Sequence, residues 1–244
     1  MHPVEALWAE HAPAAGYPRG VLPVPEPIPG LAFFPGGSGL YYAAPGRPLP
    51  PFPVGGVMVL GHDFHSEEGY RASIARGHES YSQPTWRNLV PLLGAAGIDL
   101  GACFFTNVYM GLRAGRGTTG PFPGATDPAF VAHCRRFLAR QLGAQRPALV
   151  LTLGKFAPRV LAPLSPELAG WAAAGGFKPL DAAGPVRAGV SFPGVPGLAT
   201  TVVALTHPCM RHAAVRHRRY AGACGAAAEL RMLQDGLAVG APAA

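Results

Sequence analysis

The chain has 244 residues, of which 49% are hydrophobic, and this is enough for one α/β domain with a sizeable core. It holds no run of about 18 apolar residues and no basic stretch followed by an apolar one at its start, so we expect neither a membrane span nor a secretion signal. The net charge of +7, carried mainly by arginine, permits a polyanionic partner, although this composition is equally typical of a GC-rich genome.

The first 54 residues differ in composition from the rest of the chain, because they hold nearly half of its 28 prolines. Proline lacks a backbone donor and resists both helices and central strands. We therefore predict an irregular N-terminal extension over residues 1–54, in which the aromatic segment 31–42 docks on the body of the protein. Residues 55–240 are predicted to form the α/β domain.

Four short apolar runs in this second part predict buried strands. They lie at residues 56–60 (GVMVL), 102–106 (ACFFT), 148–153 (ALVLTL) and 201–205 (TVVAL). Runs of this length that are apolar on both faces favour a parallel sheet covered on both sides. Helical patterns lie between them, so the expected architecture is a layered α/β domain with a four-stranded parallel sheet.

Two of the helices carry recognisable start signals. Thr85 is placed to cap a helix that carries Trp86 and Leu89, and Pro91 would bend it. Asp127 followed by Pro128 predicts the start of a second helix, after a Gly/Pro loop at residues 114–127.

Polar side chains follow each predicted strand. Asp63 follows the first strand, Asn107 the second, Lys155 the third and His207 the fourth. In open α/β sheets the ligand lies beyond the carboxyl ends of the strands. The sequence therefore predicts that an acid, an amide, a cation and an imidazole converge on one edge of the sheet.

Five segments around these residues resemble motifs of the uracil-DNA glycosylase superfamily, in the same order and with similar spacing. They are residues 59–65 (VLGHDFH), 83–89 (QPTWRNL), 105–108 (FTNV), 151–157 (LTLGKFA) and 206–212 (THPCMRH). The first is similar to a strand followed by Gly-Gln-Asp-Pro-Tyr-His, and the last to His-Pro-Ser with a DNA-inserting loop. The resemblance implies a three-layer α/β/α fold and excision of uracil, or of a related deaminated or modified base, from DNA.

The resemblance also implies roles for individual residues. Asp63 would activate the attacking water or stabilise positive charge on the sugar, and His207 would donate a hydrogen bond to the leaving base. Asn107 would read the edge of the extruded base, because an amide offers a donor and an acceptor. Further base contacts are expected from Gly61, His62 and Phe64, and Tyr70 is an alternative to Phe64 as the stacking ring.

DNA contacts are expected in the second, fourth and fifth motifs. The residues concerned are Pro84, Thr85, Lys155, Cys209, Met210 and Arg211. The arginines at 216, 218 and 219 follow directly and could track the DNA backbone, although charge runs are usually solvated helix faces. The implied partner is DNA that contains a damaged base, bound by a monomer.

The sequence also departs from the family pattern. Phe64 stands at the position of the motif proline and His65 at that of the tyrosine that excludes thymine, which puts strict uracil selectivity in doubt. The four cysteines are far apart, and only Cys134 falls near a cluster position of the thermophile-type members. We predict no iron–sulfur cluster, no other cofactor and a reducing, cytoplasmic location close to the nucleoid.

Two other classes of function stay open at this point. One is a metal-dependent hydrolase that uses His62, Asp63 and His65, since imidazoles and carboxylates bind zinc and activate water. The other is a non-catalytic relative that binds DNA or a free nucleobase.

Overall fold

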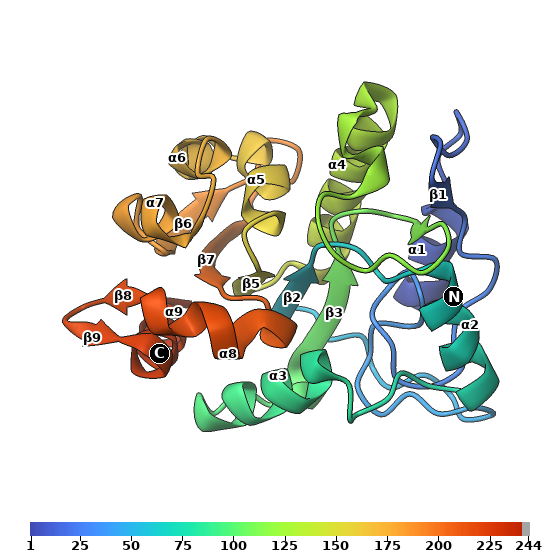
Figure 1. Cartoon of the computed structure of the whole chain (residues 1–244), viewed down its shortest axis with the longest axis horizontal. Coiled ribbons are helices and arrows are strands. Elements are labelled where there is room, and N and C mark those ends of the chain that lie inside the picture. Colours follow the sequence, from blue (N-terminus) through green and yellow to red (C-terminus); the bar gives the residue numbers. More distant parts are fainter. Residues whose placement is uncertain (241–244) are drawn as a thin grey trace.

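A five-stranded sheet forms the centre of the molecule in the computed structural model, which describes residues 1–240 (Figure 1). Its strands, in spatial order, are β3 (Cys103–Asn107), β2 (Val57–Gly61), β5 (Leu149–Leu153), β7 (Ala199–Leu205) and β6 (Val186–Ser191). The first four are mutually parallel and correspond to the four predicted strands. The prediction of four strands was one short, because β6 adds an antiparallel strand at the edge.

The fifth strand lacks the sequence pattern of the other four. Only Val190 of β6 is fully buried, whereas every residue of β2, β3 and β5 is buried. The pairing with β7 also shifts register between Arg187 and Val190, at a glycine (Gly189) whose φ is +63°. An edge strand with a bulge and one exposed face carries no continuous apolar run, so the sequence did not reveal it.

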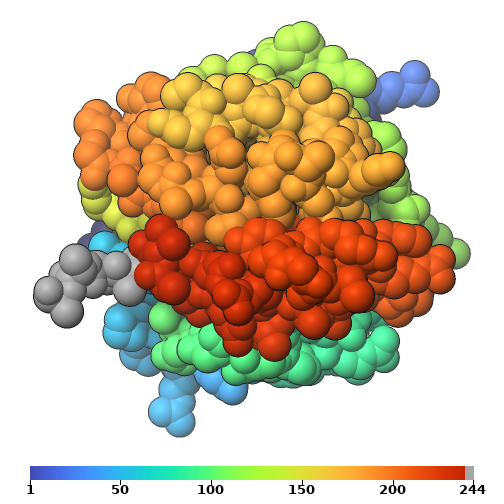
Figure 2. Space-filling view, turned by 90° about the vertical axis from the view of Figure 1, so that its left-hand side faces the viewer, coloured from blue at the N-terminus to red at the C-terminus, as the bar shows by residue number. Residues whose placement is uncertain are grey.

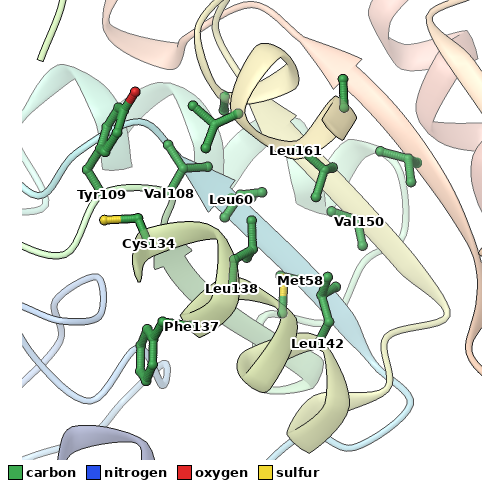
Figure 3. Close-up of a cluster of buried hydrophobic side chains, with 14 of the residues drawn as sticks. Met58, Leu60, Val108, Tyr109, Cys134, Phe137, Leu138, Leu142, Val150 and Leu161 are labelled. Carbon is green, nitrogen blue, oxygen red and sulfur yellow. The ribbon is translucent and has the colours of Figure 1, made fainter. Parts of the chain in front are cut away.

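Helices cover both faces of the sheet, which confirms the three-layer α/β/α class. One face packs against α1 (Pro3–Glu10), α4 (Pro128–Gln145), α5 (Ala157–Leu161), α6 (Ala169–Ala172) and α7 (Phe177–Ala182). The other packs against α2 (Glu67–Arg76), α3 (Pro84–Ala95) and α9 (Gly225–Gly240). Alternate residues of one strand reach opposite cores: Met58 and Leu60 of β2 meet Leu138 and Leu142 of α4, as Figure 3 shows, while Val59 faces α3.

The two predicted helix starts have different outcomes. Asp127 caps α4 as predicted, because its carboxylate accepts a hydrogen bond from the backbone N–H of Phe130 at 2.8 Å. The prediction for Thr85 was wrong: α3 begins one residue earlier, at Pro84, and its N-cap is Gln83, which makes no side-chain cap bond. Proline at the first helical position needs no donor and presets φ, so it fixes the start without a capping side chain.

The N-terminal segment contains more regular structure than its proline content indicated. It includes α1 and the short strand β1 (Val21–Leu22), which pairs with β4 (Leu112–Arg113). Residues 31–41 are buried throughout and lie along the free edge of β3, where Phe34 N–H donates to the carbonyl of Phe105 at 2.9 Å. The segment thereby covers the edge of the sheet that would otherwise be open.

A buried carboxylate ties this segment to α3. One oxygen of Glu79 accepts the indole N–H of Trp86 at 2.8 Å and the backbone N–H of Phe33 at 3.2 Å. Burial raises the pKa of Glu79 from 4.5 to about 7, although these two hydrogen bonds oppose the shift. The pKa of Glu79 is higher in the folded than in the unfolded protein. The protonated carboxyl group therefore stabilises the folded state fully below its unfolded pKa of 4.5, and this stabilisation is lost as the pH rises through about 7.

We predict that Glu79→Gln removes this pH dependence. The stability of the variant relative to the wild type should rise by roughly 2–3 kcal/mol between pH 5 and pH 8, since only the wild type must bury an ionised carboxylate at the higher pH. Urea unfolding of both proteins at several pH values measures the difference, and subtraction removes the titration of all other groups. A difference that does not change with pH would contradict the prediction.

Candidate active site

The tips of the four parallel strands bring the predicted residues to one edge of the sheet. Gly61, the last residue of β2, lies opposite Asn107, the last residue of β3, and Leu153 of β5 lies opposite Leu205 of β7. The chain leaves β2 into His62 and Asp63, and it leaves β7 into Thr206 and His207. Asn107 at the end of β3 and Asp63 after β2 therefore lie at neighbouring tips, and His207 after β7 lies at the same edge of the sheet, beyond the tip of β5.

Two glycines allow the tips to approach this closely. A Cβ atom on Gly61 would lie 2.4 Å from Oδ1 of Asn107, which is too close for any side chain. Gly154 has a φ of +82°, and a Cβ there would lie 3.2 Å from Cβ of His207. The glycines of the first and fourth motifs thus leave room for the polar side chains of the strands beside them.

Asp63 is almost fully enclosed, with 8% of its side chain exposed, and it is paired with Arg113 and with the His62 ring. Arg113 of β4 donates to both carboxylate oxygens, from Nε to Oδ1 at 3.0 Å and from Nη2 to Oδ2 at 2.8 Å. Nδ1 of His62 lies 2.8 Å from Oδ2. Burial by itself would raise the pKa of Asp63, but the hydrogen bonds from His62 and Arg113 and the charge of Arg113 outweigh it and leave the pKa below its ordinary value.

His207 is neutral and has a defined tautomer. Burial lowers its pKa to about 4, and the nearby Asp63 carboxylate only partly opposes this effect. Nδ1 accepts the backbone N–H of Cys209 at 3.3 Å and lies 2.9 Å from Sγ of the same residue. Because Nδ1 is an acceptor, the ring proton resides on Nε2, which makes that atom a hydrogen-bond donor.

Asn107 and Phe64 are packed against the N-terminal segment. Asn107 is 2% exposed, and its Nδ2 donates to the backbone carbonyl of Phe34 at 3.0 Å, which fixes the orientation of the amide. The ring of Phe64 packs on Gly36, where a Cβ would lie 2.1 Å from a ring carbon, and it meets Tyr70 edge-on. Both aromatic candidates for base stacking are buried, and the hydroxyl of Tyr70 donates to the carbonyl of Glu26.

The loop after His207 is held from two sides. It begins with a short 3-10 helix, Pro208–Met210, and continues into α8 (Arg211–Ala214). Asn88 of α3 donates from Nδ2 to the carbonyl of Pro208 at 2.8 Å. Met210 projects from this loop and is 51% exposed, whereas Arg211 turns inward and forms an ion pair with the buried Glu229 of α9. In Figure 2 this part of the chain forms a band between α3 and the α5–α7 segment.

Glu229 connects the loop to a buried network. One of its oxygens accepts the backbone N–H of Thr206 at 2.6 Å and lies 3.0 Å from Nη1 of Arg218. Arg218 is fully buried and also pairs with Asp181 of α7 at 2.8 Å. The interpretation of residues 216–219 as a surface that follows the DNA backbone is therefore wrong for Arg218, whose side chain lies in the core. Arg218 is followed by the hairpin of β8 (Arg219–Tyr220) and β9 (Ala223–Cys224).

The other residues expected to contact DNA lie around the same edge. Lys155 is exposed, and its Nζ lies 5.1 Å from the centroid of the Phe156 ring. Pro84 is exposed and Thr85 half-buried at the start of α3, the helix whose Asn88 holds the His207 loop.

The family comparison agrees with this geometry. A family model described as "Uracil DNA glycosylase superfamily" matches residues 56–223, which includes all four parallel strands and every polar residue at their tips. The chain belongs to this superfamily. The superfamily consists in general of N-glycosylases that act on DNA. A search of the curated proteins found no match to the chain.

Two residues that hold the strand-tip side chains in place were not predicted from the sequence. Arg113 lies in β4, 50 residues after Asp63, and its backbone N–H is held by the carbonyl of His65 at 3.0 Å. Glu229 lies in α9, beyond the last motif. Neither residue belongs to a motif or follows a sheet strand, so no local pattern indicated them.

Among residues 1–240, no three or more His, Cys, Asp or Glu side chains form a group that could hold a metal ion. The three residues considered for a metal hydrolase are engaged otherwise: His62 and Asp63 with each other, and His65 with Oγ of Ser66 at 3.1 Å. No helix in this part of the chain is long and apolar enough to cross a membrane.

Proposed function

We propose that this superfamily member is a monofunctional DNA glycosylase that hydrolyses the N-glycosidic bond of uracil, or of a related deaminated or modified base, extruded from DNA. The observation that carries the proposal is the neutral imidazole of His207, held with its Nε2–H as a donor at the same sheet edge as an ionised carboxylate and an amide. A departing pyrimidine anion needs such a donor, and a cation-like sugar needs the carboxylate.

Each residue has a distinct part in this proposal. His207 donates to the base oxygen on which negative charge accumulates. Asn107, whose amide is fixed by the carbonyl of Phe34, reads the base edge with its remaining N–H and its oxygen. Asp63 keeps its charge beside the sugar, because its pKa is lowered. Gly61 leaves the space in which Asn107 lies.

The DNA contacts are proposed from exposure and position. Met210 is the exposed apolar residue of the loop after His207, which suits insertion into the duplex space that an extruded base vacates. Lys155, Pro84 and Thr85 border the same edge and suit contacts to the backbone. Arg211 contributes indirectly, because its ion pair with the buried Glu229 holds the loop after His207 in position.

The test is release of base from labelled DNA duplexes that contain one uracil, with and without EDTA, followed by alkaline cleavage at abasic sites. We expect EDTA-resistant cleavage. Asp63→Asn should slow base release by about a hundredfold while DNA affinity is retained, because the carboxylate acts on the reacting centre. Wild-type rates in this variant would refute the role of Asp63, and EDTA-sensitive turnover would favour a metal-dependent hydrolase.

One observation favours a second candidate, a non-catalytic relative that binds DNA or a free nucleobase. The side chains at the strand tips are engaged within the protein, Asp63 by Arg113 and His62, and Asn107 by Phe34. Retention of uracil-containing DNA without any strand cleavage would support this candidate.

A further inference from the structure

We propose that His62 is the residue that accepts the proton of the attacking water, and that Asp63 and Arg113 position its imidazole for this step. The inference deepens the proposed glycosylase function and rests on it. It assigns to His62 a task beyond contact with the base, and it gives Asp63 a second part, the support of His62, beside its charge near the sugar.

Asp63 is poorly suited to take a proton itself. Three donors converge on its two oxygens: Nε and Nη2 of Arg113, and Nδ1 of His62. A carboxylate has about four lone-pair positions, so most of its accepting capacity is already used. Its pKa is also held below the ordinary value, which makes it a weak base.

The imidazole of His62 has the complementary arrangement. Its Nδ1 faces the carboxylate of Asp63, while its Nε2 makes no hydrogen bond to any residue from 1 to 240. An anionic partner at Nδ1 keeps the proton on that atom, so Nε2 presents a free lone pair. With 11% of its side chain exposed, the ring is enclosed yet not sealed from solvent.

Aromatic side chains hold this ring in place. His62 stacks on Phe156, with ring centroids 4.7 Å apart and planes 25° apart, and it meets Tyr109 edge-on at 5.3 Å. Phe156 follows the tip of β5, between the tips that carry Asp63 and His207. His62 and His207 thus follow the tips of β2 and β7, on either side of the strand that leads to Phe156, at one edge of the sheet.

Arg113 makes the support rigid. Besides Asp63, its guanidinium donates to three backbone carbonyls of residues 119–121, at 2.9 to 3.2 Å. All of these acceptors belong to the Gly/Pro loop between β4 and α4. A guanidinium with five donors in a fixed fork suits this task, which a lysine could not reproduce. The loop, Arg113, Asp63 and His62 form one continuous chain of contacts.

The water oxygen bonds to C1′ of the deoxyribose while the bond from C1′ to the base nitrogen breaks, and the bonding electron pair leaves with the base. The water proton passes to Nε2 of His62, whose imidazolium is stabilised by Asp63. The base anion is stabilised by Nε2–H of His207 and later takes up a proton, and His62 returns its proton to solvent.

The experiment measures single-turnover release of uracil from duplex DNA by His62→Gln, Asp63→Asn and the double variant. We expect each single variant to be slower by about a hundredfold, and the double variant to be no slower than either, because the two residues act as one unit. Imidazole added to His62→Gly should restore part of the lost rate. His133→Gln on α4, a histidine whose Nε2 lies 2.9 Å from the His11 carbonyl oxygen and whose ring stacks on Phe137, is the matched control and should keep the wild-type rate.

The outcomes separate the inference from the function on which it rests. Wild-type protein that releases no base overturns both. If the wild type is active and His62→Gln is equally fast, only the inference fails. If Asp63→Asn is slow and His62→Gln is as fast as the wild type, Asp63 rather than His62 accepts the water proton. If the rate losses of the two single variants multiply in the double variant, the two residues act separately. Circular dichroism and melting temperatures verify that each variant is folded.

Discussion

Replacing His207 with alanine should slow base release by about 10²–10³-fold while leaving the affinity for uracil-containing DNA nearly unchanged. The expected loss is large because the proposed hydrogen bond strengthens only as negative charge develops on the leaving base. Burial keeps the imidazole neutral, with a pKa of about 4, so it donates without being charged over the whole physiological range. The tautomer is fixed by the Cys209 backbone N–H at Nδ1.

Single-turnover kinetics and a binding titration with uncleaved DNA measure the two quantities separately. His207→Gln offers an amide donor in place of the ring N–H and should retain part of the rate. Protonation of His207 should not lower the rate of base release by the wild type between pH 8 and pH 5, because this imidazole protonates only near pH 4. An alanine variant that releases base as fast as the wild type would remove His207 from the mechanism.

Replacing Glu229 with alanine should destabilise the protein by about 3–5 kcal/mol. Glu229 and Arg218 are both fully buried, and the carboxylate also accepts from Arg211 and from the Thr206 backbone. Removing it leaves the Arg218 guanidinium in the core with Asp181 as its remaining carboxylate partner, and it leaves a buried N–H without an acceptor. A charge left in this way costs far more than the net contribution of the original pair.

Urea denaturation gives the change in the free energy of unfolding. Glu10→Ala is the matched control, because Glu10 pairs with Arg140 on the surface, where solvent screens the interaction, and little change is expected. Glu229→Ala should also slow base release at temperatures where it is folded, since Thr206 immediately precedes His207. Equal stability of the two variants would show that the buried network does not hold the loop.

Local sequence was sufficient for the parts of the fold that depend on short-range pattern. The apolar runs predicted four parallel strands, and the residues that follow those strands predicted which edge carries Asp63, Asn107 and His207. The pair of Asp127 and Pro128 predicted the start of α4. Each of these features is encoded within a few consecutive residues, so a single chain read in order reveals them.

Long-range contacts decided the rest. The partner of Asp63 lies 50 residues away in a two-residue strand, and the partner of the His207 loop lies in the last helix. The edge strand β6 lacks an apolar run, and Arg218 carries the same charge as its exposed neighbours although the fold buries it. A side chain's charge and hydrogen-bonding capacity are fixed by its chemistry, but its neighbours, and hence whether Asp63 or His62 is free to accept a proton, are set only when distant segments pack together.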